Sequence, residues 1–446
     1  MSHRPPSPSD RKEYARRRKQ LLKLVGKKSA VLVPAASEQI RNNDNHYPFR
    51  QSSDFWYLTG LNEPDAVLLL CPKRAEGEVI LFVTPFDPER ARWEGARTGL
   101  EGACQHYGAD QAFALDEIDE RLPELLAGYE RVTLPFAAHD WVLNTLNAFD
   151  VLRQKARSGT VPPQTLKDLA EPLHEMRLIK SPAEISHLRQ AAAVSAEAHL
   201  AAAAAVAEGM FEYELAARLH RVFQQHHGEP SFAPIVACGP NACTLHYRDN
   251  SARLEAGQLV LIDAGAEIEQ YAGDITRVWP VDGVFSPAQR AIYELVLAAQ
   301  QAAIEAIAPG VSFDAPHQAA VTVITQGLID LKLIDGPLRT ALDEGRYRRF
   351  FMHRTGHWLG LDVHDVGRYK EDGQWRALQP GMVLTVEPGL YLDEADDLPK
   401  AYRGIGVRIE DDVLVTEKGH EVLTRAVPKT VAEIEALFAR RQPRAS

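Results

Sequence analysis

The pattern of apolar residues changes between about residues 157 and 180, and this change divides the chain into two parts. Before it, short runs rich in Val, Ile and Leu, such as AVLVPA, VILFVT and RVTLPF, are separated by helix-like stretches. Strands that alternate with helices favour a mixed α/β fold around a largely buried sheet. We therefore predict an N-terminal α/β domain over residues 10–175.

The second part begins with a strong helix-start signal. Ser181 is a suitable N-cap, Pro182 suits the first helical position, and Glu184 lies three residues after the cap. Paired helices and β segments follow, which predicts an α+β domain over residues 176–437. The alanine-rich stretch 191–210 is too weakly apolar to cross a bilayer of about 30 Å, so we expect a packed helix and no membrane association.

Charge and cysteine content narrow the classes of function. The 446 residues include 61 Asp and Glu against 50 Lys and Arg, a net charge of −11. A surface that repels phosphate argues against nucleic-acid or anionic-membrane partners and favours a small substrate. Four cysteines give no disulfide framework, and no charged-then-apolar signal pattern opens the chain, so we expect a cytoplasmic protein.

Two aspartates flank a predicted hairpin in QLVLIDAGAEIEQYAGDITRVWPV. A turn centred between Ile268 and Glu269 would place Asp263 directly opposite Asp274, with their Cβ atoms about 4.5–5.5 Å apart. Both carboxylates could then bind one cation, and without a cation their charges would destabilise the sheet. The alternative is that one Asp is a turn residue and the other is solvated, because the turn lacks Asn-Gly chemistry.

A second segment, HRTGHWLGLDVHD, places His353, His357 and His364 within twelve residues. The first two have the i, i+4 spacing of a helical metal pair, but the interleaved glycines favour a loop or a bent strand. A single histidine is usually an ordinary core or surface group. Three so close together, in a Gly-rich frame, indicate a site.

Two glutamates interrupt apolar β runs. Glu387 directly precedes Pro388 and Gly389, which end the strand, and Glu410 lies two residues after Arg408, on the same strand face. A Glu in a buried strand is costly unless a metal or a base neutralises it. The alternative is an edge-strand Glu that faces water.

Together these residues form a candidate set for two divalent ions. One imidazole and four carboxylates favour Mn²⁺, Co²⁺ or Zn²⁺. Two such ions would lower the pKa of a shared water to near neutrality and hold a carbonyl for attack. The candidate metal ligands are Asp263, Asp274, His357, Glu387 and Glu410.

In order and spacing, these five residues resemble the dinuclear ligands of the pita-bread metallopeptidases, which include methionine aminopeptidase, prolidase and aminopeptidase P. HRTGHWLGLDVHD is similar to the signature shared by prolidases and aminopeptidases P, and YPFRQSSDFWYLTGLNEPDAVLLL resembles the N-terminal domain of bacterial aminopeptidase P. The similarity covers residues 10–435. It implies an Xaa-Pro aminopeptidase with an α/β N-terminal domain and an α+β pita-bread (creatinase/aminopeptidase-like) catalytic domain.

The resemblance also implies a role for each ligand. Asp263 would bind one metal, His357 and Glu387 the other, and Asp274 and Glu410 would bridge them. The most suitable ion is Mn²⁺, with Co²⁺ and Zn²⁺ as alternatives. Glu387 would also move the proton from the nucleophile to the leaving nitrogen.

Other residues match the substrate-contacting positions of the family. His364 or His246 would donate a hydrogen bond to the developing oxyanion, and His353 would contact the substrate. Tyr391 and Arg408 match a Tyr and an Arg that line the pocket.

Trp93 resembles a tryptophan that family tetramers lend to a neighbouring active site, although a surface-packed indole is an equal alternative. The implied assembly is a homodimer or a homotetramer.

Two rival functions stay open. A prolidase would use the same metals but cleave only dipeptides, and the N-terminal segment argues against it. A metal-free peptide-binding module would have no physical reason to keep all five ligand types.

Overall fold

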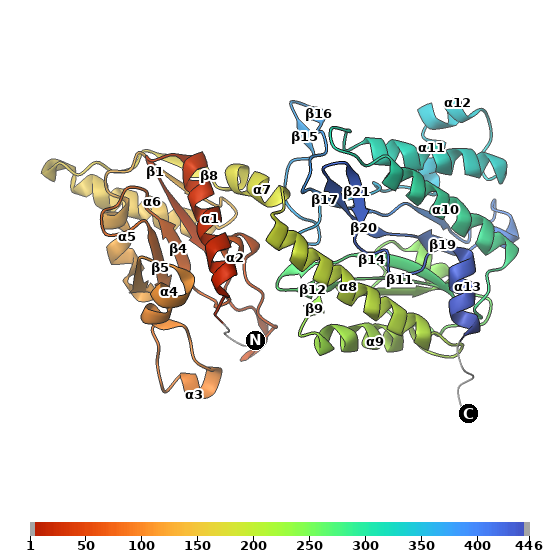
Figure 1. Cartoon of the computed structure of the whole chain (residues 1–446), viewed down its shortest axis with the longest axis horizontal. Helices are drawn as coiled ribbons and strands as arrows, with labels where there is room; N and C mark the ends of the chain where they lie inside the picture. The colour runs from red at the N-terminus through yellow and green to blue at the C-terminus, as the bar shows by residue number, and fades with distance from the viewer. Residues whose placement is uncertain (1–4, 441–446) are drawn as a thin grey trace. The chain divides into compact units, whose positions relative to one another are not determined.

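The computed structural model describes residues 5–440, and the chain forms two compact units that divide between Arg177 and Leu178 (Figure 1). Each unit has its own buried apolar core. In the described range no helix has the length and apolar character needed to cross a bilayer.

The first unit is built on a six-stranded mixed sheet with the order β6-β5-β4-β1-β7-β8. Strand β1 pairs antiparallel with β4 and parallel with β7, and its six residues are all buried. Apolar residues of α5 and α6 pack on the sheet. The strands are β1 (Ser29–Pro34), β2 (Ile40–Asn42), β3 (Asn45–His46), β4 (Val67–Leu70), β5 (Val79–Val83), β6 (Gln111–Ala114), β7 (Arg131–Leu134) and β8 (Thr165–Asp168). The helices are α1 (Pro8–Val25), α2 (Ser53–Thr59), α3 (Ala91–Glu94), α4 (Gly99–Tyr107), α5 (Ile118–Leu126), α6 (His139–Gln154) and α7 (Ala170–Leu178).

In the second unit, strands lie between two helix pairs, α8 with α9 and α10 with α11 (Figure 1). The helices are α8 (Pro182–Ala205), α9 (Glu212–Gln225), α10 (Pro287–Glu305), α11 (Ala315–Asp330), α12 (Leu338–Asp343) and α13 (Val431–Ala439). The strands are β9 (Glu229–Pro230), β10 (Ile235–Cys238), β11 (Leu259–Ala264), β12 (Ala266–Ile268), β13 (Tyr271–Ala272), β14 (Ile275–Pro280), β15 (Lys370–Glu371), β16 (Gln374–Trp375), β17 (Val383–Val386), β18 (Gly389–Leu392), β19 (Ile405–Arg408), β20 (Asp411–Thr416) and β21 (Gly419–Val422). The named pairings within these small sheets are antiparallel.

The predicted helix start is present. Ser181 Oγ accepts the backbone N–H of Glu184, and the Glu184 carboxylate accepts the N–H of Ser181, which forms a capping box. The alanine-rich stretch continues this helix to Ala205 and buries one of its faces against the strands. It is a packed helix, as predicted.

The hairpin that carries the two aspartates has a different register from the predicted one. Asp263 lies opposite Thr276 rather than Asp274, because the turn is centred on Glu269 and Gln270. Both turn residues have positive φ values, 51° and 64°, a conformation that favours Asn and Gly. Asp274 therefore directly precedes β14 and lies two positions before Thr276, the ladder partner of Asp263.

Candidate active site

The five predicted metal ligands come from separate segments of the second unit. Asp263 lies on β11, and Asp274 directly precedes β14. Glu387 directly follows β17, and Glu410 lies between β19 and β20. His357 lies in the irregular segment before β15, which confirms the loop that the glycines predicted. All five line one cavity of about 760 Å³.

Three of the five form the tightest group. Asp274, His357 and Glu410 each offer a ligand atom, and these atoms all lie within 4.8 Å of one another. His357 Nε2 is 3.6 Å from Asp274 Oδ2 and 3.4 Å from Glu387 Oε1. The fifth residue, Asp263, meets Arg408 instead, whose Nη2 donates to Asp263 Oδ2 at 2.6 Å.

The four carboxylates carry more negative charge than the surrounding protein balances. Burial, together with neighbouring carboxylates, raises the pKa of Asp274 and that of Glu410 well above their ordinary values. Among the described residues, Arg408 is the only Lys or Arg paired with any of the four. One carboxylate oxygen of Asp263 and one of Asp274 are buried without a hydrogen-bond partner.

These observations fit divalent cations. A buried anionic oxygen without a partner is costly, and a bound cation removes that cost. Four carboxylates and one imidazole are donors that suit Mn²⁺, Co²⁺ and Zn²⁺.

The remaining sequence-predicted residues, except Trp93, line the same cavity. His364 faces His357, with ring centroids 4.3 Å apart. Burial, with a smaller effect from His357, lowers the pKa of His364. Burial also lowers the pKa of His353. The substrate-side residues that line the cavity are His246, His353, His364, Tyr391 and Arg408.

A continuous series of hydrogen bonds connects His353, on the substrate side of the cavity, to the carboxylates of Asp263 and Glu410. His353 Nε2 lies 2.9 Å from Tyr391 Oη, and Arg408 Nη1 donates to the same oxygen at 3.0 Å. Arg408 Nε also donates to Thr276 Oγ1 at 3.1 Å, and Thr276 Oγ1 donates to Glu410 Oε2 at 2.6 Å. Arg408 and Glu410 thus lie on the same side, as their spacing predicted.

Trp93 lies in the first unit, on α3, and is 90% exposed. It is not among the residues that line the cavity.

Sequence reasoning missed several residues that contact or directly follow the candidate metal ligands. Thr276 and Thr385 donate hydrogen bonds to Glu410 and Glu387, respectively. Asp411 and Asp412 continue the acidic run after Glu410 and are fully buried. Three consecutive acids in an apolar run were a readable signal, since buried carboxylates need partners.

The fold and this site define a class of protein. The model of the metallopeptidase family M24 matches residues 186–417, and that of the aminopeptidase P N-terminal domain matches residues 14–134. The chain belongs to the metallopeptidase family M24 and is a metal-dependent peptidase. The family and the fold class predicted from the sequence are thereby confirmed.

Individual relatives are similar over nearly the whole chain. An Xaa-Pro aminopeptidase of Haemophilus influenzae is 45% identical over 96% of this chain and 97% of its own length, and that of Escherichia coli is 44% identical over 97% and 99%. Among solved structures, aminopeptidase PepP of Pseudomonas aeruginosa has a TM-score of 0.95 at 50% identity, covering 98% of this chain and 99% of its own. Aminopeptidase P of E. coli with the inhibitor Pro-Leu has a TM-score of 0.93 at 43% identity, covering 97% and 99%.

Proposed function

We propose that this chain is an Xaa-Pro aminopeptidase, a metal-dependent hydrolase that releases the N-terminal residue of peptides with proline second. The observation that carries the proposal is the cavity of the second unit, where four carboxylates and four histidines meet. This cavity belongs to an M24 chain that is similar to Xaa-Pro aminopeptidases over nearly its full length.

We assign two divalent ions to the site, with Mn²⁺ preferred and Co²⁺ or Zn²⁺ as alternatives. Asp263 would hold one ion, His357 and Glu387 the other, and Asp274 and Glu410 both. When bound, such ions lower the pKa of a shared water and polarise the scissile carbonyl.

The chain's own side chains would move the proton and hold the peptide. Glu387 Oε1 accepts a hydrogen bond from Thr385 Oγ1 at 3.2 Å, which orients the carboxylate that would pass a proton to the leaving proline nitrogen. His364 and His246 would donate to the carbonyl oxygen as negative charge develops there. Because the pKa of His364 is lowered, its imidazole is neutral at pH 7 and donates through its single N–H.

This arrangement suits a proline in the second position. The Xaa-Pro bond has no N–H, so an enzyme that grips a backbone donor at that position loses its contact. Carbonyl polarisation and a shaped pocket need no such donor. The apolar part of the wall, formed by Phe232, Ile235 and Leu245 among others, offers a surface for a pyrrolidine ring.

We further propose a homodimer or homotetramer in which Trp93 of one copy reaches the site of another. An indole that is 90% exposed, on a short helix without buried residues, has apolar area available for such an interface. A loss of assembly in Trp93→Ala, measured by sedimentation, would support this role.

The two rival functions, a metal-free binding module and a prolidase, agree less well with the contacts in the cavity. A metal-free binding module would keep Asp274 and Glu410 in mutual repulsion with no compensating gain. A prolidase needs a cation that binds the carboxylate following proline, and Arg408 does not suit that role because it is already engaged with Asp263.

The test uses chelator-stripped full-length protein, assayed before and after Mn²⁺ is restored. Two peptides that differ only in proline or alanine at the second position serve as substrates. We expect release of the first residue from the proline peptide alone, and only after the metal is restored. Equal cleavage of both peptides, or activity that ignores the metal, would contradict the proposal.

A further inference from the structure

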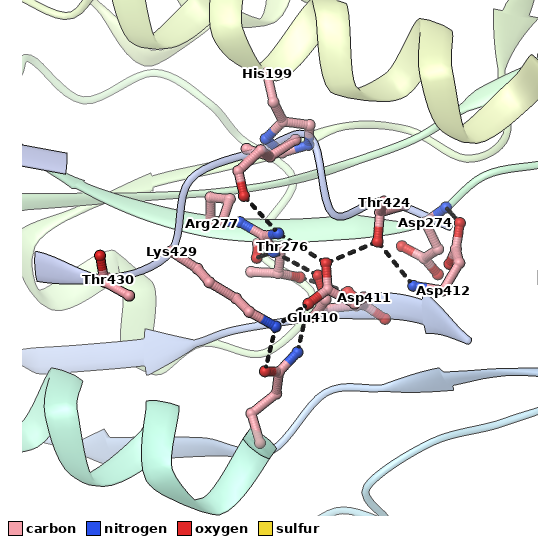
Figure 2. Close-up of polar contacts among 12 residues, drawn as sticks. His199, Asp274, Thr276, Arg277, Glu410, Asp411, Asp412, Thr424, Lys429 and Thr430 are labelled. Atoms are coloured by element: carbon pink, nitrogen blue, oxygen red, sulfur yellow. Dashed lines mark hydrogen bonds and ion pairs between the residues drawn. The ribbon is translucent and has the colours of Figure 1, made fainter. Parts of the chain in front are cut away.

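Directly behind the acidic cavity, the carboxylate of Asp411 accepts four hydrogen bonds from three different segments (Figure 2). Its Oδ1 accepts from Arg277 Nη2 and Thr424 Oγ1, each at 2.7 Å. Its Oδ2 accepts from Gln300 Nε2 at 2.7 Å and Lys429 Nζ at 2.6 Å. The Asp411 side chain is fully buried, so this carboxylate joins β20 to β14, to α10 and to the segment that follows β21.

Arg277 connects the Asp411 carboxylate to the backbone of Glu410 and to the strand that follows Asp274. It lies on β14, three residues after Asp274, and its Nη1 donates to the backbone carbonyl of Glu410 at 2.5 Å. The same nitrogen donates to the carbonyl of Thr276 at 3.0 Å. One buried guanidinium therefore fixes the backbone that presents Glu410 relative to the strand that begins after Asp274.

A second contact couples the same two segments. The backbone N–H of Asp274 donates to Asp412 Oδ2 at 3.1 Å, and the N–H of Asp412 donates to Thr424 Oγ1 at 3.1 Å (Figure 2). Since Thr424 also donates to Asp411, one threonine ties both acids of β20 to the same support.

The hydrogen-bond network around Asp411 lies where it can hold the segments of Asp274 and Glu410 in place. Asp274 and Glu410 repel each other, so without a cation the local electrostatics push their segments apart. A buried ion pair is weak evidence for overall stability, because apolar residues of equal volume serve as well or better. It can, however, define geometry, because each charge requires its partners at fixed distances.

We propose that Asp411 is a positioning residue that, through Arg277 and Lys429, holds Glu410 at the distance from Asp274 at which both take cations together. The proposal rests on the assignment of Asp274 and Glu410 as shared metal ligands. Asp411 itself faces away from the cavity and is not among its lining residues.

The test is a calorimetric titration of Mn²⁺ into chelator-stripped full-length protein, wild type and Asp411→Asn. Asparagine keeps the size of the side chain, but its NH₂ group cannot accept a hydrogen bond from the donors that surround Asp411. The substitution also leaves Arg277 and Lys429 without a counter-charge. Loss of a residue that orients metal ligands typically costs about 10–100-fold in metal affinity, and we expect that loss here. Activity should return toward the wild-type value at saturating Mn²⁺, which a misfolded site would not allow.

Asp54→Asn is the matched control. Asp54 lies in the first unit, where Arg177 Nη1 donates to its Oδ1 at 2.7 Å and His174 Nε2 is 3.3 Å from its Oδ2. This substitution should lower the unfolding temperature and leave Mn²⁺ affinity unchanged. Should Asp411→Asn fail to fold, Lys429→Met keeps the Arg277 pair and is expected to weaken Mn²⁺ binding in the same direction by a smaller factor.

The outcomes separate the two proposals. If the wild-type chain binds no Mn²⁺, the proposed function fails. If the wild type binds Mn²⁺ and the Asp411 and Lys429 variants bind it equally well, the positioning role alone is overturned. An equal loss of affinity in Asp54→Asn would also overturn it, because the effect would then reflect general destabilisation.

Discussion

At the scale of single residues, the central feature is a pair of buried carboxylates whose charges are unfavourable without a counter-ion. Burial and neighbouring acids raise the pKa of both Asp274 and Glu410. A carboxyl group with a raised folded-state pKa stabilises the fold below its unfolded pKa, and this contribution is lost as the pH rises through the folded pKa. At neutral pH the metal-free site therefore destabilises the chain, and metal binding reverses the effect.

Asp274→Asn tests this balance through two effects of opposite sign. The neutral amide cannot bridge cations as a carboxylate does, so metal loading and activity should both be lost. In chelated protein at pH 8, however, the variant should unfold at a higher temperature than wild type, because the repulsion with Glu410 is gone. Elemental analysis that finds two ions per variant chain would rule out the bridging assignment, and a lower unfolding temperature would contradict the electrostatic account.

His364→Ala tests the proposed oxyanion donor. Its ring faces His357, and we expect a fall in kcat of about 10²–10³ with both metals retained. Steady-state kinetics at saturating substrate, with metal content measured on the same sample, gives both readouts. Loss of metal would make His364 a ligand, and unchanged kinetics would make it structural.

The site residues that could be predicted from the sequence are those whose polar side chains interrupt an apolar run. Glu387 and Glu410 stand out because each interrupts an apolar run. Thr276 and Arg277 did not stand out, because their partners lie more than 130 positions away and only the tertiary fold brings them together. A residue that acts by supporting another leaves no mark on its own neighbourhood in the sequence.

At the scale of elements, the hairpin shows where pattern reading fails. The periodicity of apolar residues predicted both strands. The register, however, depends on the turn, where Glu269 and Gln270 adopt positive φ values that are unusual for these residue types. The close approach of the two backbones after Asp263 is not evident from the sequence either. A Cβ atom on Gly265 would lie 1.6 Å from the carbonyl oxygen of Gly273, so only glycine permits this close approach.

Helix α8 is held to the central strands by a buried histidine, which gives the protein a predictable pH dependence. His199 Nε2 lies 3.0 Å from the carbonyl oxygen of Ala264, and burial lowers the pKa of His199 to about 4. In the unfolded chain a histidine titrates near pH 6.5 (approximate reference value). Between these values the unfolded state binds more protons, so stability should fall as the pH decreases through this window, by up to about 1.4 kcal/mol per pH unit.

His199→Gln isolates this contribution, since the amide can still donate to Ala264. The variant should be less stable than wild type at pH 7.5, and the difference should narrow as the pH approaches 4.5. Denaturant titrations at several pH values measure it. Parallel stability profiles would show that His199 does not titrate as its burial requires.

At the scale of the whole molecule, the residues proposed for chemistry come from the second unit alone, and Trp93 is the single candidate from the first. The location of the site in the second unit could be predicted from the sequence, because the candidate catalytic residues lie in short segments that are recognisable one by one. It could not show the cavity itself, since its wall combines segments from Phe232 to Glu410 that meet only in the folded chain.

The choice between an aminopeptidase and a prolidase depends on the pocket beyond the proline. A dipeptidase must bind a free carboxylate there, and a cation kept for that purpose is costly to leave unpaired. Arg408 is 4% exposed and already donates to Asp263, Tyr391 and Thr276, so it is committed within the protein. The cavity of about 760 Å³ is also large for a dipeptide alone, since sites of roughly 300–1,000 Å³ hold drug-sized ligands.

We therefore expect an Xaa-Pro-Xaa tripeptide to be cleaved with a kcat/KM at least equal to that of the matching Xaa-Pro dipeptide, releasing only the first residue. Chromatography of both reactions gives the answer, and a tripeptide left intact while the dipeptide is cut would identify a prolidase.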